Sequence, residues 1–465
     1  MPRLTVNDLK GEQKRVLILP FENPVLIKGC AGSGKTTVAK FRALHLMQDQ
    51  LLFQATNVAV FSYTNALISY IRSLTAPRSL YVTTLHSYAG RLCLELKKAD
   101  DDKLNAAIHS AVQHARTTHN SQVAVLSKGL DFYNDEFSWI KGRSISTLDE
   151  YISTARTGRG TSARVTSSDK ELLWTAFEHY NNSLSRQGLC DWSDLVLKAL
   201  QKAEAPHFTP PFSHIVVDEA QDLTLAQLKL IAKLVSPHTN SITLVADSAQ
   251  RIYQSGFSWA DTGLNIRGRS FEFTKNYRNT RQIATAALSL LQKESDRTDF
   301  TDVELPEQMG AKPRLFFANS FEHQLQVLFD VLAQFAEMSS IAIASPSRKN
   351  VSWITKSLEA KGIAVVSLKN IKNGHPSRFC FVDTLHSLKG VEFDHVILCD
   401  LNSELLEDAP KEPDEDTVSL KRKLLYVGMT RSRCSLTMIA SGKPSRLLAD
   451  IDQSTIEVPQ YPSPI

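Results

Sequence analysis

Residues Gly29-Cys30-Ala31-Gly32-Ser33-Gly34-Lys35-Thr36 read G-x-x-x-x-G-K-T, the sequence pattern of a P-loop. The apolar run Val25–Lys28 before this stretch is typical of a buried strand, and residues 37–46 after it have the apolar spacing of a helix. A strand, a glycine turn and a helix N-terminus in this order direct backbone N–H groups toward a polyphosphate. Lys35 is placed to reach the β- and γ-phosphates, and the Thr36 hydroxyl to bind Mg²⁺. The stretch predicts a nucleoside triphosphate site, and its flanking elements argue against a chance glycine turn.

The composition is that of a globular protein with more than one domain. The chain has 465 residues, 42% of them hydrophobic and 22% charged, and a formal net charge of +4. This weakly basic balance permits a polyanionic partner without requiring one, since a solvated basic face is the commoner cause. No apolar run approaches the roughly 20 residues that span a bilayer, and residues 1–8 lack a signal-peptide core. The six scattered cysteines, without C-x-x-C spacing, favour reduced thiols over disulfides or a metal site. We expect a cytoplasmic protein without membrane contact.

A second strand carries two acids to the edge of a sheet. The apolar run His214–Val217 is followed directly by Asp218 and Glu219. Asp218 is placed to bind Mg²⁺, directly or through water, and Glu219 to orient or deprotonate the attacking water. A solvated acidic turn is the alternative, although a P-loop needs such a partner. A further strand at 241–245 leads to Gln250, which is placed to sense the γ-phosphate.

Two other apolar runs, 57–61 and 80–83, end in polar and aromatic residues, and ligands bind at such strand ends in open parallel sheets. Between about residues 91 and 187 long helical periodicities dominate, which we interpret as a helical insertion. Its basic stretch Arg156–Arg164 is equally consistent with a phosphate-contacting loop and with a solvated turn.

A second α/β unit begins near Phe273. Its expected core strands, separated by helical stretches, are residues 314–317, 340–344, 364–367, 379–384 and 395–399. This half has no P-loop of its own, but Arg278 and Arg431 would suit γ-phosphate contacts made across a cleft between the units. We interpret the acidic, proline-containing segment Asn402–Thr417 as an exposed loop, and the residues after about Asp452 as a frayed end.

Nine motifs resemble, in order, those of the superfamily I DNA helicases of the UvrD, Rep and PcrA type, and together they span nearly the whole chain. They are Gln13 (Q motif), Gly29–Thr36 (I), Phe61–Asn65 (Ia), Thr84–Ser87 (Ib), Asp218–Asp222 (II), Asp247–Tyr253 (III), Asn276–Arg278 (IV), Thr384–Phe393 (V) and Leu425–Ser432 (VI). One such string is weak evidence, but nine in the family's order are specific. The resemblance implies an α/β fold of two RecA-like P-loop domains, with parallel sheets flanked by helices and a helical 1B-type insertion. The implied domains are 1A (residues 1–90 and 188–272), 1B (91–187) and 2A (273–465).

The resemblance also implies how ATP and Mg²⁺ are bound. Tyr277 would stack on adenine while Gln13 reads the base, and Glu392 would bear on the ribose. Arg278 and Arg431 would act as arginine fingers from the second domain. The candidate catalytic residues are Lys35, Asp218, Glu219, Gln250, Arg278 and Arg431. The candidate cofactor-binding residues are Gln13, Gly29, Ala31, Gly32, Ser33, Gly34, Lys35, Thr36, Thr37, Tyr277 and Glu392, and the metal ligands are Thr36 and Asp218.

A row of aromatic and polar side chains would lie along single-stranded DNA. The candidates are Tyr63, Asn65, His86, Phe257, Trp259, Thr384, His386, Ser387 and Lys389. Stacking on rings is sequence-tolerant and contributes roughly 1–3 kcal/mol per base, which suits a motor indifferent to sequence. Thr384, Ser387 and Lys389 would hold phosphates. Ordinary core packing is the alternative for Phe257 and Trp259.

Three departures from the family pattern stand out. Motif III begins Ala246-Asp247 where the family usually has Gly-Asp, and Phe257 and Trp259 lie a few residues later than the usual aromatic. Larger members carry a 2B domain just before motif V, but here only residues 370–377 connect the strands. We therefore expect a compact form in which 2B is absent or vestigial.

The leading hypothesis is an ATP-dependent helicase or translocase that moves 3′→5′ on single-stranded or tailed duplex DNA, in DNA repair, replication restart or defence against foreign DNA. The alternative is a DNA-stimulated ATPase that serves as the regulatory subunit of a partner nuclease or effector. An unrelated P-loop kinase or GTPase is disfavoured, because it leaves motifs IV–VI unexplained and no guanine-reading N-K-x-D is present.

Overall fold

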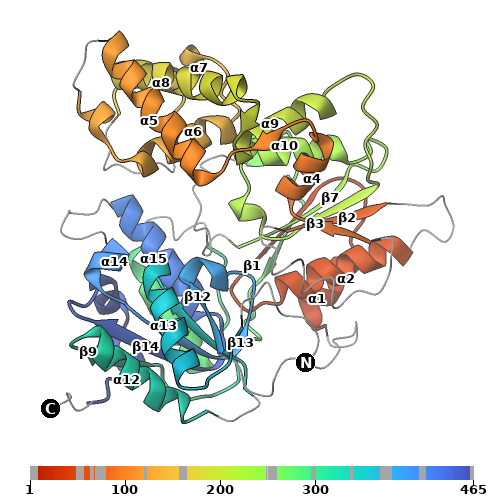
Figure 1. Cartoon of the computed structure of the whole chain (residues 1–465). Helices are drawn as coiled ribbons and strands as arrows, with labels where there is room; N and C mark the ends of the chain where they lie inside the picture. The colour runs from red at the N-terminus through yellow and green to blue at the C-terminus, as the bar shows by residue number, and fades with distance from the viewer. Residues whose placement is uncertain are drawn as a thin grey trace.

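The computed structural model describes residues 9–48, 57–62, 68, 80–119, 123–156, 165–247, 249, 259–294, 300–335, 339–366, 380–407 and 415–460. For residues 48, 259, 260, 407, 415 and 416 it describes the backbone alone. Figure 1 shows two α/β units and a separate cluster of helices at the upper left. Among the described residues, no helix has the length and apolarity needed to cross a membrane. The mixed α/β fold with parallel sheets flanked by helices, expected from the motifs, is confirmed.

The first unit is built on a six-stranded parallel sheet in the order β3-β2-β6-β7-β1-β8. Its strands are Val25–Gly29 (β1), Val58–Phe61 (β2), Leu80–Thr83 (β3), His214–Val217 (β6), Ser241–Ala246 (β7) and Ser270–Phe273 (β8). The central strands β2, β6 and β7 are buried at every residue, because helices cover both faces of the sheet. The neighbouring strands β1, β7 and β6 deliver the P-loop and the acidic residues to one edge.

Two apolar layers cover this sheet, because successive strand residues point to opposite faces. Leu26 belongs to the layer formed with α4 (Leu85–Leu92), α9 (Trp192–Ala203) and α10 (Leu225–Leu234). Ile27 belongs to the opposite layer, formed with α1 (Gly11–Leu17) and α2 (Lys35–Gln48). The P-loop and the Q-motif helix therefore lie on the same side of the sheet.

The second unit has its own six-stranded parallel sheet, in the order β11-β12-β10-β13-β14-β9. Its strands are Arg314–Ala318 (β9), Ile341–Ser345 (β10), Val365–Val366 (β11), Cys380–Thr384 (β12), Phe393–Leu398 (β13) and Ser432–Ser441 (β14). The helices α11 (Arg281–Leu290) and α15 (Glu415–Met429) pack on one face. The helices α12 (Phe321–Leu332) and α13 (Arg348–Ala360) pack on the other.

The helical cluster consists of α5 (Asp101–Thr118), η2 (Ala124–Ser127), α6 (Leu130–Gly142), α7 (Leu148–Ser153) and α8 (Ser167–Arg186). It has an apolar core of its own, which includes the aromatic side chains of Tyr133, Phe137 and Trp139. The chain leaves and re-enters the first unit through the short parallel pair β4 (Lys97–Lys98) and β5 (Leu189–Cys190). Arg156 pairs with the fully buried Glu136 (Nη2–Oε2, 2.6 Å), so this arginine is structural, whereas residues 157–164 lie outside the described residues.

Two segments that the sequence suggested were exposed contribute to the fold instead. The segment 402–417 contains the helix α14 (Ser403–Glu407), whose Leu406 is fully buried in the core of the second unit. The chain after Asp452 also packs, since Ile456 is buried and Glu457 exchanges backbone hydrogen bonds with Pro313 and Leu315. In both cases single apolar residues in a polar context anchor the backbone.

Candidate nucleotide site and nucleic-acid interface

The P-loop turns between the end of β1 and the start of α2 as its sequence predicts. Gly32 and Gly34 have φ values of 77° and 80°, in the left-handed region that disfavours side chains. A Cβ atom at Gly32 would collide with the Asn276 side chain, and one at Gly34 would lie 2.6 Å from Gln13 Nε2. The glycines thus allow the Q motif and motif IV to approach the loop closely. The structure brings the phosphate-binding candidates from Gly29 to Thr37 together at this turn.

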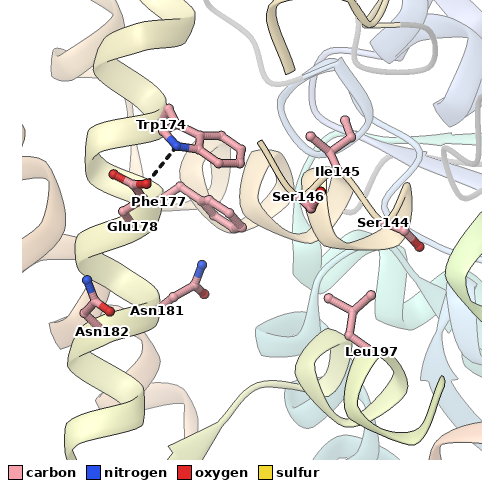
Figure 2. Close-up of a pocket in the computed structure, with 9 residues that line it drawn as sticks. All are labelled: Ser144, Ile145, Ser146, Trp174, Phe177, Glu178, Asn181, Asn182 and Leu197. Carbon is pink, nitrogen blue, oxygen red and sulfur yellow. Dashed lines mark hydrogen bonds between the residues drawn. The ribbon is translucent and has the colours of Figure 1, made fainter. Parts of the chain in front are cut away.

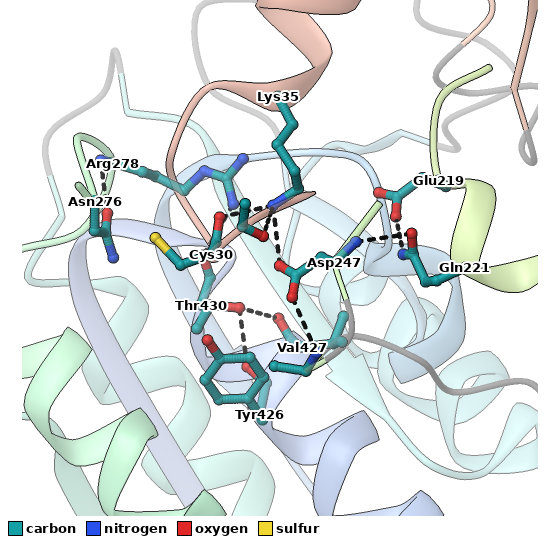
Figure 3. Close-up of polar contacts among 12 residues, drawn as sticks. Cys30, Lys35, Glu219, Gln221, Asp247, Asn276, Arg278, Tyr426, Val427 and Thr430 are labelled. Atoms are coloured by element: carbon teal, nitrogen blue, oxygen red, sulfur yellow. Dashed lines mark hydrogen bonds and ion pairs between the residues drawn. The ribbon is translucent and has the colours of Figure 1, made fainter. Parts of the chain in front are cut away.

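Lys35 makes three polar contacts within the site. Its ammonium donates to the carbonyl oxygens of Gly29 (2.8 Å) and Cys30 (2.6 Å) and to Asp247 Oδ2 (2.9 Å). Figure 3 shows Asp247, which follows β7, beside this lysine. Sequence reasoning did not include Asp247 among the site residues, although motif III contains it. The phosphates of a nucleotide would compete with this carboxylate for Lys35.

Asp218 lies at the end of β6 and is almost completely buried. Its Oδ1 accepts a hydrogen bond from the Glu219 N–H (3.0 Å), and the nearby Thr36 hydroxyl acts to lower the pKa of its carboxyl group. Within the described residues, Asp218 Oδ2 is buried with no hydrogen-bond partner. Burial and the adjacent Glu219 carboxylate raise the pKa of Asp218. A hydroxyl and a carboxylate with an open oxygen are ligands that suit Mg²⁺, so these residues fit the metal.

Glu219 is held in a fixed position beside Asp218. Its backbone has φ 57° and ψ 40°, a left-handed conformation that a non-glycine residue keeps only where its surroundings impose it. Gln221 Nε2 donates to Glu219 Oε2 (2.5 Å), and Gln221 Oε1 accepts from the Asp247 N–H (3.0 Å; Figure 3). Burial opposes ionisation, but the charges of Lys389, Arg431 and Lys35 hold the pKa of Glu219 below its usual value. The side chain is therefore an anion suited to accept a proton from water.

The two arginines from the second half of the sequence lie near the P-loop and the motif II acids. Arg278 Nη2 lies 2.5 Å from Glu392 Oε1, and the Tyr277 N–H donates to the carbonyl of Gly32 in the P-loop (2.9 Å). Arg431 is buried, and its Nε donates to the Val427 carbonyl (3.1 Å). Burial and the neighbouring Arg278 lower the pKa of Arg431 to about 10, so it stays charged at neutral pH.

The residues expected at the base and ribose lie beside the P-loop. Gln13 is buried and donates from Nε2 to the Ser33 carbonyl (2.8 Å). Tyr277 is 37% exposed, and the ammonium groups of Lys10 and Lys275 lie 5.4 Å and 5.9 Å from its ring centroid. Glu392 is paired with Arg278, so a ribose contact would have to compete with that ion pair.

The structure describes only part of the expected DNA track. Tyr63, Asn65, Gln250 and Phe257 lie outside the described residues, and Trp259 is described by its backbone alone, in η5 (Trp259–Thr262). His386 is exposed on η9 (Leu385–Leu388), and the Thr384 and Ser387 hydroxyls lie 3.0 Å apart beside it. Although the side chain of His386 reaches solvent, desolvation by the surrounding protein and the cations Lys421, Arg348 and Lys389 lower its pKa.

His86 contacts Trp192, an aromatic residue that was not among the candidates from the sequence. Its ring makes an edge-on contact with Trp192 (5.4 Å between centroids), and the Lys98 ammonium lies 3.8 Å from the Trp192 ring centroid. Trp192 is 49% exposed at the first position of α9. An exposed indole flanked by a cation suits a nucleobase. A tryptophan directly after the capping residue Asp191 was the available signal.

Lys389 is buried, whereas a residue that contacts DNA phosphates would lie on the surface. Its side chain is 2% exposed, and its ammonium lies 2.5 Å from Asp222 Oδ2 and 4.0 Å from Glu219 Oε2. The lysine therefore faces the motif II carboxylates of the first unit. Its expected role as a DNA phosphate ligand does not fit this placement.

A groove of about 420 Å³ lies apart from these residues, between α8, the loop before α7 and α9 (Figure 2). Its floor is formed by Trp174 and Phe177, and Trp174 Nε1 donates to Glu178 Oε1 (3.0 Å). It lacks the cations of a phosphate site among the residues that line it.

Comparison with known proteins agrees with this geometry. The model of the UvrD/REP helicase N-terminal domain matches residues 9–264, and that of the UvrD-like helicase C-terminal domain matches residues 375–443. A probable DNA helicase from Mycoplasma pneumoniae is 24% identical over 97% of this chain and 88% of its own length. The ATP-dependent DNA helicase PcrA of Staphylococcus aureus is 26% identical over 63% of this chain, which spans 41% of that relative.

A solved structure, the C-terminal domain of a possible DNA helicase from Lactobacillus plantarum, aligns with 40% of the chain at 26% identity and a TM-score of 0.31. The N-terminal family model covers more than half of the chain, and the C-terminal model follows it in the expected order. The chain therefore belongs to the UvrD/REP helicase family of ATP-hydrolysing enzymes that act on DNA.

Proposed function

We propose that the chain hydrolyses ATP in the cleft between its two α/β units and uses the cycle to move 3′→5′ on single-stranded DNA, opening tailed duplexes. The observation that carries this proposal is the shared site. Lys35, Asp218 and Glu219 come from the first unit, whereas Arg278 contacts Glu392 and Arg431 lies in the second. Because the site is divided between two units, the binding and release of nucleotide would change how closely the two units approach each other.

Each side chain has a defined task in the proposed reaction. The P-loop N–H groups and Lys35 would bind the phosphates, and Thr36 and Asp218 would hold Mg²⁺, which would offset the phosphate charge. Glu219 orients the attacking water and accepts its proton. Arg278 and Arg431 stabilise the charge that develops on the γ-phosphate.

We further propose that DNA passes over both units. On the first unit, His86 and Trp192 offer ring surfaces and Lys98 a cation. On the second, His386 lies beside the hydroxyls of Thr384 and Ser387. The units would correspond to domains 1A (1–90 and 188–272) and 2A (273–465), with 1B at 91–187. Because β11 ends at Val366 and β12 begins at Cys380, only residues 367–379 separate them, which supports a compact form without a 2B domain.

The test is the steady-state ATPase rate with and without single-stranded DNA, in the wild type and in Glu219→Gln. We expect DNA to stimulate the wild type and the variant to lose about 10²- to 10⁴-fold in kcat while still binding ATP, because it lacks the proton acceptor. The proposal would be wrong if DNA does not stimulate the ATPase rate, or if Glu219→Gln hydrolyses ATP as fast as the wild type. Strand displacement on duplexes with 3′ or 5′ tails reports the direction.

The short connection at 367–379 also favours a second candidate, a DNA-stimulated ATPase that regulates a partner nuclease or effector. In that case the isolated protein hydrolyses ATP on DNA but opens no duplex until the partner is added. Duplex opening by the protein alone excludes this candidate. Recovery of the native protein from cells, followed by identification of co-purifying proteins, would also indicate repair, replication restart or defence against foreign DNA.

A further inference from the structure

A buried ion pair joins the two α/β units beside the nucleotide site. The Lys389 ammonium lies 2.5 Å from Asp222 Oδ2 and 4.0 Å from Glu219 Oε2, and at most 2% of the Lys389 and Asp222 side chains is exposed. Lys389 follows η9 in the second unit, whereas Asp222 ends η3 (Ala220–Asp222) in the first. A cation enclosed in this way neutralises carboxylates and does not face a DNA backbone.

The turn η9 links this lysine to the proposed DNA surface. Leu385 and Leu388 are fully buried in the core of the second unit, while His386, between them, is exposed. The Lys389 N–H donates to the His386 carbonyl (3.3 Å), which closes the turn. Because the two leucines are close-packed, a shift of the exposed side of this short turn moves Lys389 with it.

The segment η3 links the same ion pair to the reaction. The Asp222 N–H donates to the Glu219 carbonyl (3.1 Å), so the two acids belong to one tight turn. Gln221 Nε2 donates to Glu219 Oε2 (2.5 Å), and Gln221 Oε1 accepts from the N–H of Asp247, whose carboxylate binds Lys35. A displacement of Asp222 therefore reaches the Glu219 carboxylate and the P-loop lysine through consecutive contacts.

We propose that Lys389 is a positioning residue that couples DNA on the exposed side of η9 to the placement of Glu219, through its ion pair with Asp222. The inference rests on the proposed function, because it requires single-stranded DNA to reach His386. It gives Asp222 and Lys389 one shared role in the activation of hydrolysis by DNA.

The experiment compares Lys389→Met, Asp222→Asn and the double variant with the wild type. The first readout is the stimulation ratio, which is kcat with saturating DNA divided by kcat without it. We expect each single variant to lower this ratio at least tenfold, and the double variant to be no worse than the more impaired single one, since the pair acts as a unit. The second readout is the salt dependence of single-stranded DNA affinity, which we expect to keep its wild-type slope.

A phosphate ligand would behave differently. Loss of one phosphate contact reduces the slope of log affinity against log salt by about 0.7. Such a reduction in Lys389→Met, or a stimulation ratio within twofold of wild type at saturating DNA, would overturn the inference. Additive losses in the double variant would do so as well. If Lys389→Met does not fold, as judged by thermal unfolding, Asp222→Asn carries both readouts.

Lys361→Met is the matched control, because it removes an exposed cation at the end of α13 and leaves both readouts within twofold of wild type. A similar fall in its stimulation ratio would attribute the effect to net charge and overturn the inference. A wild-type protein that DNA does not stimulate would instead contradict the proposed function itself, so the two failures are distinguishable.

Discussion

Three cations of the nucleotide site each have a carboxylate partner within hydrogen-bond distance: Lys35 with Asp247, Arg278 with Glu392, and Lys389 with Asp222. A buried charge without such a partner would cost several kcal/mol. The phosphates of a bound nucleotide would compete with Asp247 for Lys35 and with Glu392 for Arg278. The positive charges of the site are thus already positioned by ion pairs, and nucleotide binding would exchange some of these pairs for contacts to phosphate.

Trp192 offers a direct test of the DNA surface. We expect Trp192→Ala to weaken single-stranded DNA binding by roughly 1–3 kcal/mol, because a base loses its stacking partner. Trp192→Phe should retain most of the affinity, since it keeps an aromatic face. Fluorescence-anisotropy titration with a labelled oligonucleotide measures both, and the ATPase rate without DNA serves as the control. Equal losses in the two variants would argue against stacking.

Individual site residues were predictable from the sequence where a short local motif contains the chemical groups that the site needs. Lys35, Thr36, Asp218 and Glu219 lie together as expected, since the P-loop and the acidic strand end are local patterns. The placement of Lys389 was not predictable, because the approach of the two units decides which carboxylate a lysine meets. Trp192 was missed for a related reason. Only the fold reveals that it lies beside His86 and remains exposed.

At the scale of elements, the helical cluster is joined to the first unit by a buried cation. Lys141 of α6 lies 2.7 Å from both Asp191 Oδ2 and Asp194 Oδ1 at the start of α9, and the Tyr180 hydroxyl donates to Asp191 (2.9 Å). Asp191 also caps α9, whose first residue is Trp192. These contacts fix the cluster and the exposed tryptophan to the same support.

We expect Lys141→Met to destabilise the protein by about 3–5 kcal/mol, because it leaves two partly buried carboxylates without their cation. Lys202→Met is the matched control. Its exposed pair with Glu95 has a similar distance of 2.7 Å, but solvent screens these charges, so we expect a much smaller loss of stability. Urea unfolding followed by circular dichroism compares the two variants. Similar losses would contradict the assigned importance of burial.

Asp394, at the start of β13, predicts a pH dependence of stability. Its Oδ2 accepts from the Ser340 N–H (3.0 Å) and hydroxyl (2.8 Å), and Arg433 Nη2 donates to Oδ1 (2.6 Å). Burial opposes ionisation, but these Ser340 donors and the Arg433 charge lower the pKa of Asp394 below its usual value. The contribution of ionised Asp394 to the free energy of unfolding is therefore fully present above the unfolded pKa of about 3.9. It is lost as the pH falls through the folded pKa.

We expect Asp394→Asn to cost about 1 kcal/mol at pH 7 and the same at pH 5. The difference in the free energy of unfolding between the variant and the wild type should narrow below about pH 3.9, because the wild-type carboxyl is then protonated. Urea unfolding at pH 7, 5 and 3.5 measures this difference. A difference that stays the same at pH 3.5 as at pH 7 would show that the hydrogen bonds, and not the charge, carry the effect.

Elements with continuous apolar runs were predicted well, and elements that depend on neighbours were not. The parallel strands around the P-loop are buried on both faces, so their composition alone identifies them. The ten-residue strand β14 was missed, since polar residues such as Ser435 and Thr437 interrupt its apolar run. The helix α14 was missed because a single buried leucine, Leu406, is its main anchor.

At the scale of the whole molecule, the P-loop contacts the segment that connects the two units. The Gly32 carbonyl accepts from the Tyr277 N–H (2.9 Å), and Asn279 Nδ2 donates to the Thr430 carbonyl (3.1 Å) in the second unit. Ala31 also packs in the same apolar cluster as the core of the second unit. A nucleotide in the P-loop would therefore lie beside residues of both halves of the chain.

Arg278 should be the residue that converts nucleotide binding into closure of both units. In the wild type, a non-hydrolysable ATP analogue with Mg²⁺ should slow hydrogen exchange in the P-loop and also at the end of α15, near Arg431. In Arg278→Ala we expect protection of the P-loop to persist and protection near Arg431 to be lost. The kcat for ATP should fall by roughly 10³- to 10⁵-fold, the range for an arginine finger. Removal of Mg²⁺ by EDTA should abolish hydrolysis in both proteins.

Protection near Arg431 in the variant, with near-normal turnover, would mean that the second unit closes without this arginine.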